Sequence, residues 1–189
     1  MPSPTLRGID TYRGHRVYAE SWAAESGYAE FDFAGKRVAV VGTDAFTVRI
    51  VPELVDTACF VKVFQHPPRW VLPRLDESVP AAVSSLLAKA LATQRLVAPL
   101  CKAYLRAQVK DPWLRRQLTP DVAPGSAHML ISSDYYPALQ RANCKLIDWP
   151  IATLSPVGIR TSDGVEHHLD AIVFAAGHDA GPGDTQYVR

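Results

Sequence analysis

Residues 41–46 have the residue types and the spacing of a turn that binds a phosphate group. Gly42 ends an apolar run, and the residues after it have helical spacing, so a strand should pass through a tight turn into a helix. The free N–H groups and the positive dipole at the start of such a helix bind the pyrophosphate of a dinucleotide. The segment therefore predicts a dinucleotide site. Its candidate contacts are Gly42, Thr43, Asp44, Ala45 and Phe46.

Asp44 departs from this chemistry. A dinucleotide turn needs a second glycine at this position, so that the backbone can approach the phosphate closely. The carboxylate of Asp44 would instead repel a phosphate and compete for the same N–H groups. Alternatively, Asp44 is simply the N-cap of the helix, a position that aspartate favours. The sequence leaves both interpretations open.

The end of the second expected strand, residues 60–64, carries the next candidates. An NAD site has a carboxylate at this point to hold the ribose diol, whereas an NADP site prefers a positive group. No carboxylate follows this strand, which argues against NAD. His66 or Arg69 could meet a 2′-phosphate, and a solvated surface role is the alternative for either.

The other polar groups favour structural roles. His167 and His168 are adjacent on an expected strand, so they point to opposite faces and cannot share one metal ion. No group of His, Cys and Asp has the spacing of a zinc site. Residues 132–134 lack the glycines of a nucleophile elbow and are typical of a turn. The sequence therefore predicts no metal site and no nucleophile.

The elements that position the dinucleotide turn form a βαβ unit. Residues 37–41 are a continuous β-branched run, as in a strand buried on both faces. Apolar residues recur at helical spacing from Ala45 to Asp56, and residues 60–64 form a second strand. Strand, turn, helix and strand within about thirty residues open a doubly wound sheet. The predicted fold class is α/β with a Rossmann-like sheet.

The rest of the chain adds a helical excursion and further strands. Residues 80–110 are rich in helix-forming residues, with Pro99 expected to break or kink the helix. Loops are expected over residues 111–128, where proline recurs. The further strands expected are 128–132, 145–149 and 170–174, with a hairpin of 158–161 and 165–169 around a Ser-Asp-Gly turn.

Composition limits the function classes. The 189 residues carry a net charge of +1, which gives no reason to expect nucleic acid or an anionic membrane as a partner. No apolar run reaches the roughly 18 residues of a membrane span, and the first residues lack a signal-peptide core. A cytoplasmic location is therefore expected. The three cysteines, far apart in sequence, indicate reduced core thiols.

A longer set of motifs resembles the NADPH-binding stretch of flavin-containing and Baeyer–Villiger monooxygenases. The resemblance extends from about Gly8 to Asp179. It implies a lead-in linker at 1–30, an NADPH-binding Rossmann-like domain at 31–178 and a tail at 179–189, with a helical insertion at about 78–116 and the FAD-binding portion missing. The matching segments are 35–43, 50–54, 63–65, 70–74, 118–121, 133–137 and 172–175.

Several ligand positions depart from the family's pattern. The fingerprint that joins the flavin and nicotinamide domains has Tyr18 in place of a histidine. Only Gly42 survives from the glycine motif, and the ring of Phe46 would fill space that the pyrophosphate needs. Gln65 and His66 match the family's Gln-Arg pair, whose arginine grips the 2′-phosphate, but His is mostly neutral at pH 7.

Three further positions are matched by the resemblance. Ala175 and Gly177 stand in the family's closing Ala-Thr-Gly motif. Arg141 matches the arginine that stabilises the peroxyflavin, and it is the candidate catalytic residue. An exposed loop cation is the alternative interpretation of Arg141.

The resemblance implies an FAD- and NADPH-dependent monooxygenase that oxygenates ketones, amines or sulfides through a peroxyflavin. Because the departures gather at ligand positions, the first hypothesis is an impaired or inactive remnant of such an enzyme. The second is one subunit of a split monooxygenase, completed by a separate FAD-binding chain. The third is a non-catalytic interaction module, and a homo-oligomer is a further expected assembly.

Overall fold

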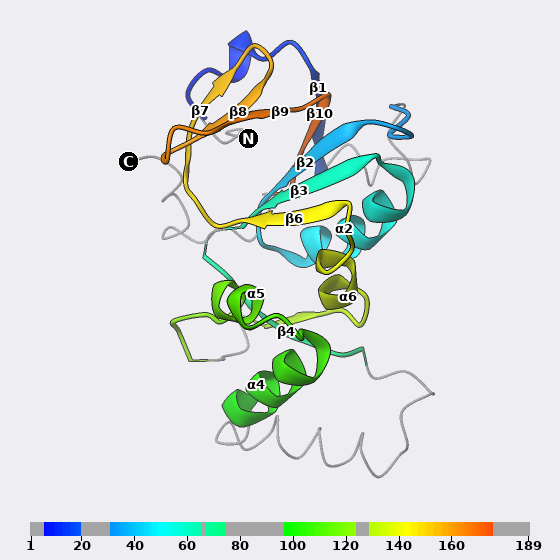
Figure 1. Cartoon of the computed structure of the whole chain (residues 1–189), viewed down its shortest axis with the longest axis vertical. Coiled ribbons are helices and arrows are strands. Elements are labelled where there is room, and N and C mark those ends of the chain that lie inside the picture. Colours follow the sequence, from blue (N-terminus) through cyan, green and yellow to red (C-terminus); the bar gives the residue numbers. More distant parts are fainter. Residues whose placement is uncertain (1–5, 20–30, 66, 75–96, 124–128, 176–189) are drawn as a thin grey trace.

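The computed structural model describes residues 6–19, 31–65, 67–74, 97–123 and 129–175. A five-stranded sheet lies at the centre of these residues, and all four of its strand pairs are parallel (Figure 1). The order is β1-β10-β2-β3-β6. The strands are β1 (His15–Tyr18), β2 (Arg37–Val41), β3 (Phe60–Phe64), β6 (Cys144–Ile147) and β10 (Ala171–Phe174).

The central strands are buried because their residues are apolar on both faces. Val38, Val40, Val61 and Val63 are fully shielded from solvent and face the helices. The strands predicted at 37–41, 60–64 and 170–174 agree with the structure to within one residue. The chain is therefore a mixed α/β fold built on a parallel sheet.

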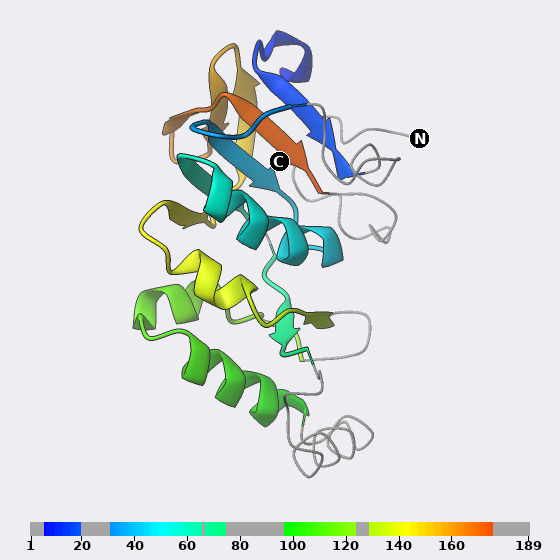
Figure 2. The same cartoon turned by 90° about the vertical axis from the view of Figure 1, so that its right-hand side faces the viewer.

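Helices cover one face of this sheet. The main one is α2 (Ala45–Thr57), whose predicted apolar stripe at Val48, Val51, Leu54 and Val55 is buried. The short helix α6 (Tyr135–Leu139) packs beside α2, as Figure 2 shows. The helix α2 continues through Pro52, although proline lacks the N–H that would bond to the carbonyl of Val48.

An antiparallel sheet covers the other face. Its strands β7 (Ile151–Ser155), β8 (Gly158–Thr161) and β9 (Glu166–His168) follow one another along the chain. Their apolar residues form a second core with the sheet residues Ala39 and Phe64. A doubly wound sheet has helices on both faces, so the described residues differ from that expectation on this face.

His167 joins the two sheets. Its side chain is buried while that of His168 is exposed, as the alternation along a strand predicts. Nδ1 of His167 lies 3.2 Å from Nζ of Lys62 on β3, and Nε2 lies 3.2 Å from Oγ1 of Thr161. The Thr161 hydroxyl in turn donates to Asp163 at 2.6 Å. A polar chain thus links the central sheet to the antiparallel one.

The N-terminal part differs from its prediction. Residues 1–30 were expected to be a lead-in, but Ile9–Thr11 form a 3-10 helix, η1, and β1 is an edge strand of the central sheet. Val17 of β1 is buried in the main core. The expected boundary at residue 30 therefore does not separate residues 6–18 from the domain.

The middle of the chain also differs in part. Residues 111–128 were expected to be loops, but α5 (Pro112–Gln117) lies there, capped by Asp111. Pro99 lies inside α4 (Val97–Gln108). A small parallel sheet pairs β4 (Trp70–Leu72), which was not expected, with β5 (Met129–Ile131). The first part of the expected insertion, and the tail at 179–189, lie outside the described residues.

Cys101 and Cys144 are buried and Cys59 is exposed, and all three are free thiols.

Among the residues that the structure describes, no helix is long and apolar enough to cross a membrane. Within the same residues no group of His, Cys, Asp and Glu could hold a metal ion.

Candidate functional site

The turn at Gly42 lies at the carboxyl edge of the parallel sheet, where three strands end together. The N–H of Gly42 donates to the backbone carbonyl of Phe64, at the end of β3, at 3.1 Å. The N–H of Ala175, just after β10, donates to the carbonyl of Val41 at 2.9 Å. Gly42 is buried and has φ 137°, in the region that favours glycine. The structure therefore places Ala175 next to the Gly42 turn.

Asp44 is the N-cap of α2. Its Oδ1 accepts a hydrogen bond from the backbone N–H of Thr47 at 2.9 Å and from the Thr47 hydroxyl at 3.2 Å. The capping interpretation of Asp44 is therefore confirmed. The carboxylate occupies an N–H group at the helix start that an anion would otherwise use.

The carboxyl group of Asp44 is partly buried. Burial raises the pKa of this carboxyl, while the hydrogen bonds from Thr47 and the nearby charge of Arg69 act in the opposite direction. Arg69 follows β3 in the sequence. It is one of the two residues proposed above as a contact of a 2′-phosphate. In this structure its charge lies close enough to Asp44 to affect its ionisation.

Phe46 and Thr43 flank Asp44. The Phe46 ring is half-buried against the main core, and the guanidinium of Arg49 lies 5.6 Å from its centroid. A bulky ring therefore stands in the first turn of α2. Oγ1 of Thr43 is buried and has no hydrogen-bond partner among the described residues. Ala45, the first residue of α2, is exposed.

Gln65 points into the protein. Its side chain is only 4% exposed, and its Oε1 accepts a hydrogen bond from the Tyr135 hydroxyl at 2.9 Å. Gln65 therefore ties the end of β3 to α6. Tyr135 was not anticipated as its partner. The candidates His66 and Gly177 lie outside the described residues.

Arg141 lies at the other end of α2. Its side chain is 58% exposed, and Nη1 is 3.5 Å from Oδ1 of Asp56 in the last turn of that helix. A helix of 13 residues is about 20 Å long at 1.5 Å per residue. The structure therefore does not bring Arg141 together with Gly42, Asp44 and Phe46.

The chain is similar in sequence to curated monooxygenases. A Baeyer–Villiger monooxygenase of Pseudomonas aeruginosa is 31% identical over 202 residues, which cover 94% of this chain and 37% of that protein. The FAD-binding monooxygenase ktnD of Aspergillus niger is 32% identical over 208 residues, covering 95% of this chain and 33% of that protein. This chain thus spans 33–37% of the length of these relatives. No protein-family model matches it.

Solved structures have the same fold. The structure of OTEMO in complex with FAD and NADP is similar with a TM-score of 0.77 and 25% identity, over 100% of this chain and 47% of that one. An oxidised steroid monooxygenase bound to NADP has a TM-score of 0.77 at 23% identity, covers 100% of this chain and 46% of that one, and is similar in fold alone.

Proposed function

Because the chain is homologous over nearly its whole length to a segment of the Baeyer–Villiger and FAD-binding monooxygenases, we propose that it forms the Rossmann-like, nicotinamide-binding portion of such an enzyme. The whole enzyme would use FAD and NADPH to oxygenate ketones, amines or sulfides. In this proposal the present segment holds NADPH, and FAD is bound by protein outside it.

One observation carries this proposal. The buried Gly42, at positive φ, joins β2 to α2 at the carboxyl edge of the sheet, where β3 and β10 also end. Ligands of open parallel sheets bind at this edge, and a pyrophosphate binds at the start of the helix that follows such a turn. A solved relative of the same fold carries FAD and NADP.

The residues at the turn do not fit a tightly held pyrophosphate. The Asp44 carboxylate takes the Thr47 N–H at 2.9 Å and would place a negative charge beside the phosphates. The ring of Phe46 stands in the same helical turn. We therefore propose that the segment binds nicotinamide dinucleotides weakly and that, as it stands, it is impaired.

A split enzyme is the second candidate, and the exposed side chain of Trp149 favours it. Trp149 follows the carboxyl end of β6 and is 55% exposed. Aromatic rings are enriched in the interfaces between protein chains, so this ring offers a separate FAD-binding chain a place to pack. Isolation of the native complex tests this: a flavin-bearing partner supports it, whereas a complex without any nucleotide favours an interaction module.

The main test is calorimetric titration of the full chain with NADPH and with NADH. The triple variant Asp44→Gly, Phe46→Ser and His66→Arg restores the glycine, the space and the positive charge. We expect it to bind NADPH at least tenfold more tightly than the natural chain, and to prefer NADPH over NADH.

The control is Asp111→Gly, which removes the equivalent cap of α5, where Asp111 accepts from Trp113 N at 2.9 Å. It should leave NADPH binding unchanged. If the folded triple variant gains no affinity, the phosphate site has been assigned to the wrong residues. Tight binding of NADPH by the natural chain would contradict the proposed impairment.

A further inference from the structure

The side chain of Lys62 reaches from the central sheet to the antiparallel one. Lys62 is the middle residue of β3, and its Nζ lies 3.2 Å from Nδ1 of His167 on β9. His167 is buried, whereas Lys62 is only half-buried and stays in part open to solvent. An amine that is partly shielded from water, yet still open to it, is a candidate for chemical modification.

The hydrogen bonds beyond His167 determine which of its ring nitrogens carries the proton. The Thr161 hydroxyl lies 2.6 Å from the carboxylate of Asp163 and 3.1 Å from the carbonyl of Val165. At neutral pH both of these oxygens can only accept, so the hydroxyl donates to them and its own oxygen accepts from Nε2 of His167. With the proton on Nε2, the lone pair of Nδ1 accepts from Lys62. His167 is then neutral, and Nδ1 can take a proton from the amine.

A second lysine stands beside Lys62. Lys62 and Lys145 are partners in the pairing of β3 with β6, and neighbouring strands lie about 4.8 Å apart. Cys144 and Leu146 belong to the main core, so Lys145 between them points to the opposite face, toward the antiparallel sheet, as Lys62 does. Neither lysine forms an ion pair with a carboxylate among the residues that the structure describes. Their charges repel each other, so a change that removes the charge of Lys62 is favoured.

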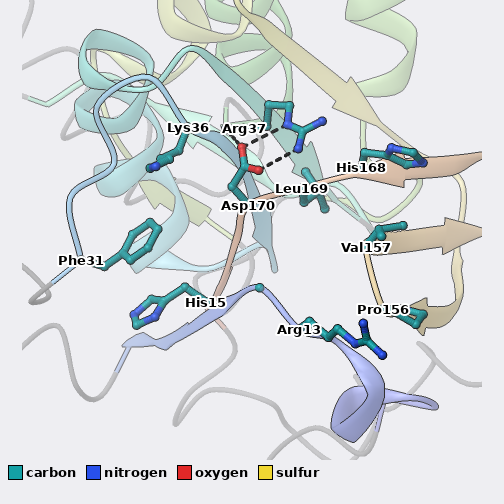
Figure 3. Close-up of a pocket in the computed structure, with 11 residues that line it drawn as sticks. Arg13, His15, Phe31, Lys36, Arg37, Pro156, Val157, His168, Leu169 and Asp170 are labelled. Atoms are coloured by element: carbon teal, nitrogen blue, oxygen red, sulfur yellow. Dashed lines mark hydrogen bonds and ion pairs between the residues drawn. The ribbon is translucent and has the colours of Figure 1, made fainter.

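Arg37 is a third cation near Lys62, and it already has a carboxylate partner. Figure 3 shows Arg37 directed at Asp170, where Nη2 and Nε donate to the two carboxylate oxygens at 2.7 and 3.0 Å. Burial lowers the pKa of Lys62, and the charges of Lys145 and Arg37 act in the same direction. A desolvated lysine beside another cationic group is a known form of a nucleophilic amine.

We propose that the amine of Lys62 reversibly binds CO₂ as a carbamate. The lone pair of Nζ forms a bond to the carbon of CO₂, and one carbon–oxygen π bond opens to leave a negatively charged oxygen. Nδ1 of His167 takes the proton that Nζ loses, and His167 then releases it to solvent. The N–H that remains on Nζ still donates to His167, and the new carboxylate is an ion-pair partner for Lys145.

CO₂ fits this place by its size and by the charge of its product. It is small enough to reach a half-buried amine, and the carbamate places an anion next to Lys145. An aldehyde or an acyl group would leave no anion there. The step needs no oxidant or reductant. The inference does not depend on the proposed function, because Lys62 is none of the residues assigned to the dinucleotide.

The test is carbon NMR of the full chain in isotope-labelled bicarbonate, followed by trapping of the carbamate as its ethyl ester with triethyloxonium and peptide mapping by mass spectrometry. The trapped ester should lie on Lys62 in preference to the other lysines, and Lys62→Arg should remove it. Lys145→Gln should lower the carbamylated fraction about tenfold, because the carbamate loses its cation. His167→Gln keeps a hydrogen-bond acceptor but no base, so it should slow the exchange between carbamate and free CO₂.

The matched controls are Lys102→Gln, an exposed lysine on α4, and His168→Gln, the exposed neighbour of His167. They should change neither the carbamylated fraction nor the exchange rate. The proposal is overturned if the natural chain carries no ester on Lys62, if the ester is spread evenly over the lysines, or if Lys145→Gln leaves the fraction unchanged. An unchanged exchange rate in His167→Gln overturns the role of His167 as the base. Because the site is mapped in the natural chain, this result does not require any variant to fold.

Discussion

The hydroxyl of Ser132 donates a hydrogen bond to the backbone carbonyl of Val48, at 3.2 Å. Pro52 lies four residues after Val48 in α2 and has no N–H, so the helix itself cannot satisfy this carbonyl. The same Ser132 oxygen accepts from the backbone N–H of Tyr135 at 3.2 Å, at the start of α6. One buried hydroxyl therefore satisfies the Val48 carbonyl that Pro52 leaves without its helical N–H donor, and it also accepts a hydrogen bond at the start of α6.

Ser132→Ala should destabilise the protein by about 1–3 kcal/mol, because it leaves buried backbone groups without partners. Pro52→Ala supplies the missing N–H to Val48. In that background Ser132→Ala should cost about 1 kcal/mol less. Urea denaturation of the four proteins measures this coupling.

Ser133→Ala is the control, because among the described residues its exposed hydroxyl accepts only from Arg74 N, at 3.1 Å. Equal costs of Ser132→Ala in both backgrounds would mean that Ser132 does not compensate for Pro52.

Asp44→Asn separates the charge of Asp44 from its capping role. Asparagine caps a helix about as well as aspartate, so the free energy of unfolding should change by under about 0.5 kcal/mol. Removing one negative charge beside a phosphate should raise NADPH affinity about tenfold. Calorimetry measures the affinity, and Asp111→Asn is the matched control. Unchanged affinity would show that the charge of Asp44 is not the obstacle.

Arg141→Ala should leave NADPH affinity unchanged. The side chain is exposed and pairs with Asp56 at the far end of α2 from Asp44. Loss of such a surface pair should also lower stability by less than about 1 kcal/mol. A large fall in the NADPH affinity of the variant would instead place Arg141 at the nicotinamide site, as the family resemblance implies.

His167 should make stability depend on pH. Burial and the neighbouring charges of Lys62 and Lys145 lower the pKa of His167, against an opposing effect of Asp163. Below about pH 6.5 the unfolded chain therefore binds a proton that the folded chain resists, so the free energy of unfolding should fall as the pH is lowered through this range. Chemical denaturation between pH 8 and pH 5 measures the slope.

His167→Gln should flatten this slope, whereas His168→Gln, at the exposed neighbouring position, should not. A slope that survives His167→Gln would assign the effect to another group.

Gly158→Ala should be strongly destabilising, by roughly 3 kcal/mol or more. A Cβ at this position would collide with the backbone carbonyl of His167 on β9. Gly164→Ala is the comparison. A Cβ at Gly164 would meet open space, but the backbone there has φ +86°, so the substitution should lower the free energy of unfolding by about 1–2 kcal/mol. Thermal unfolding ranks the two. Similar small losses would mean that β8 and β9 can separate without harm to the fold.

Local pattern predicted the elements that carry a strong signal of their own. The β-branched run before Gly42, the apolar stripe of α2 and the hairpin around residues 162–164 all appear in the structure. The capping role of Asp44 was one of the two interpretations that the sequence left open, and it could be raised there because it depends only on residues within one helical turn.

Partners distant in sequence could not be predicted in this way. Gln65 matches a family motif at the surface of a site, yet its amide is turned inward by Tyr135, 70 residues later. The strand β1 is only four residues long and has two exposed residues, so its periodicity is weak. The covering of one face by β7, β8 and β9 depends on contacts between sheets that no local pattern encodes.

The place of β10 has a consequence for biosynthesis. Among the strands that the structure describes, β10 is the last of the central sheet along the chain, but it lies between β1 and β2, which are made before it. Until it emerges from the ribosome, these two strands have unpaired edges, which are sites for aggregation. The nascent chain must therefore wait for residues 171–174 before its sheet can close, and a holdase chaperone would protect it during that delay.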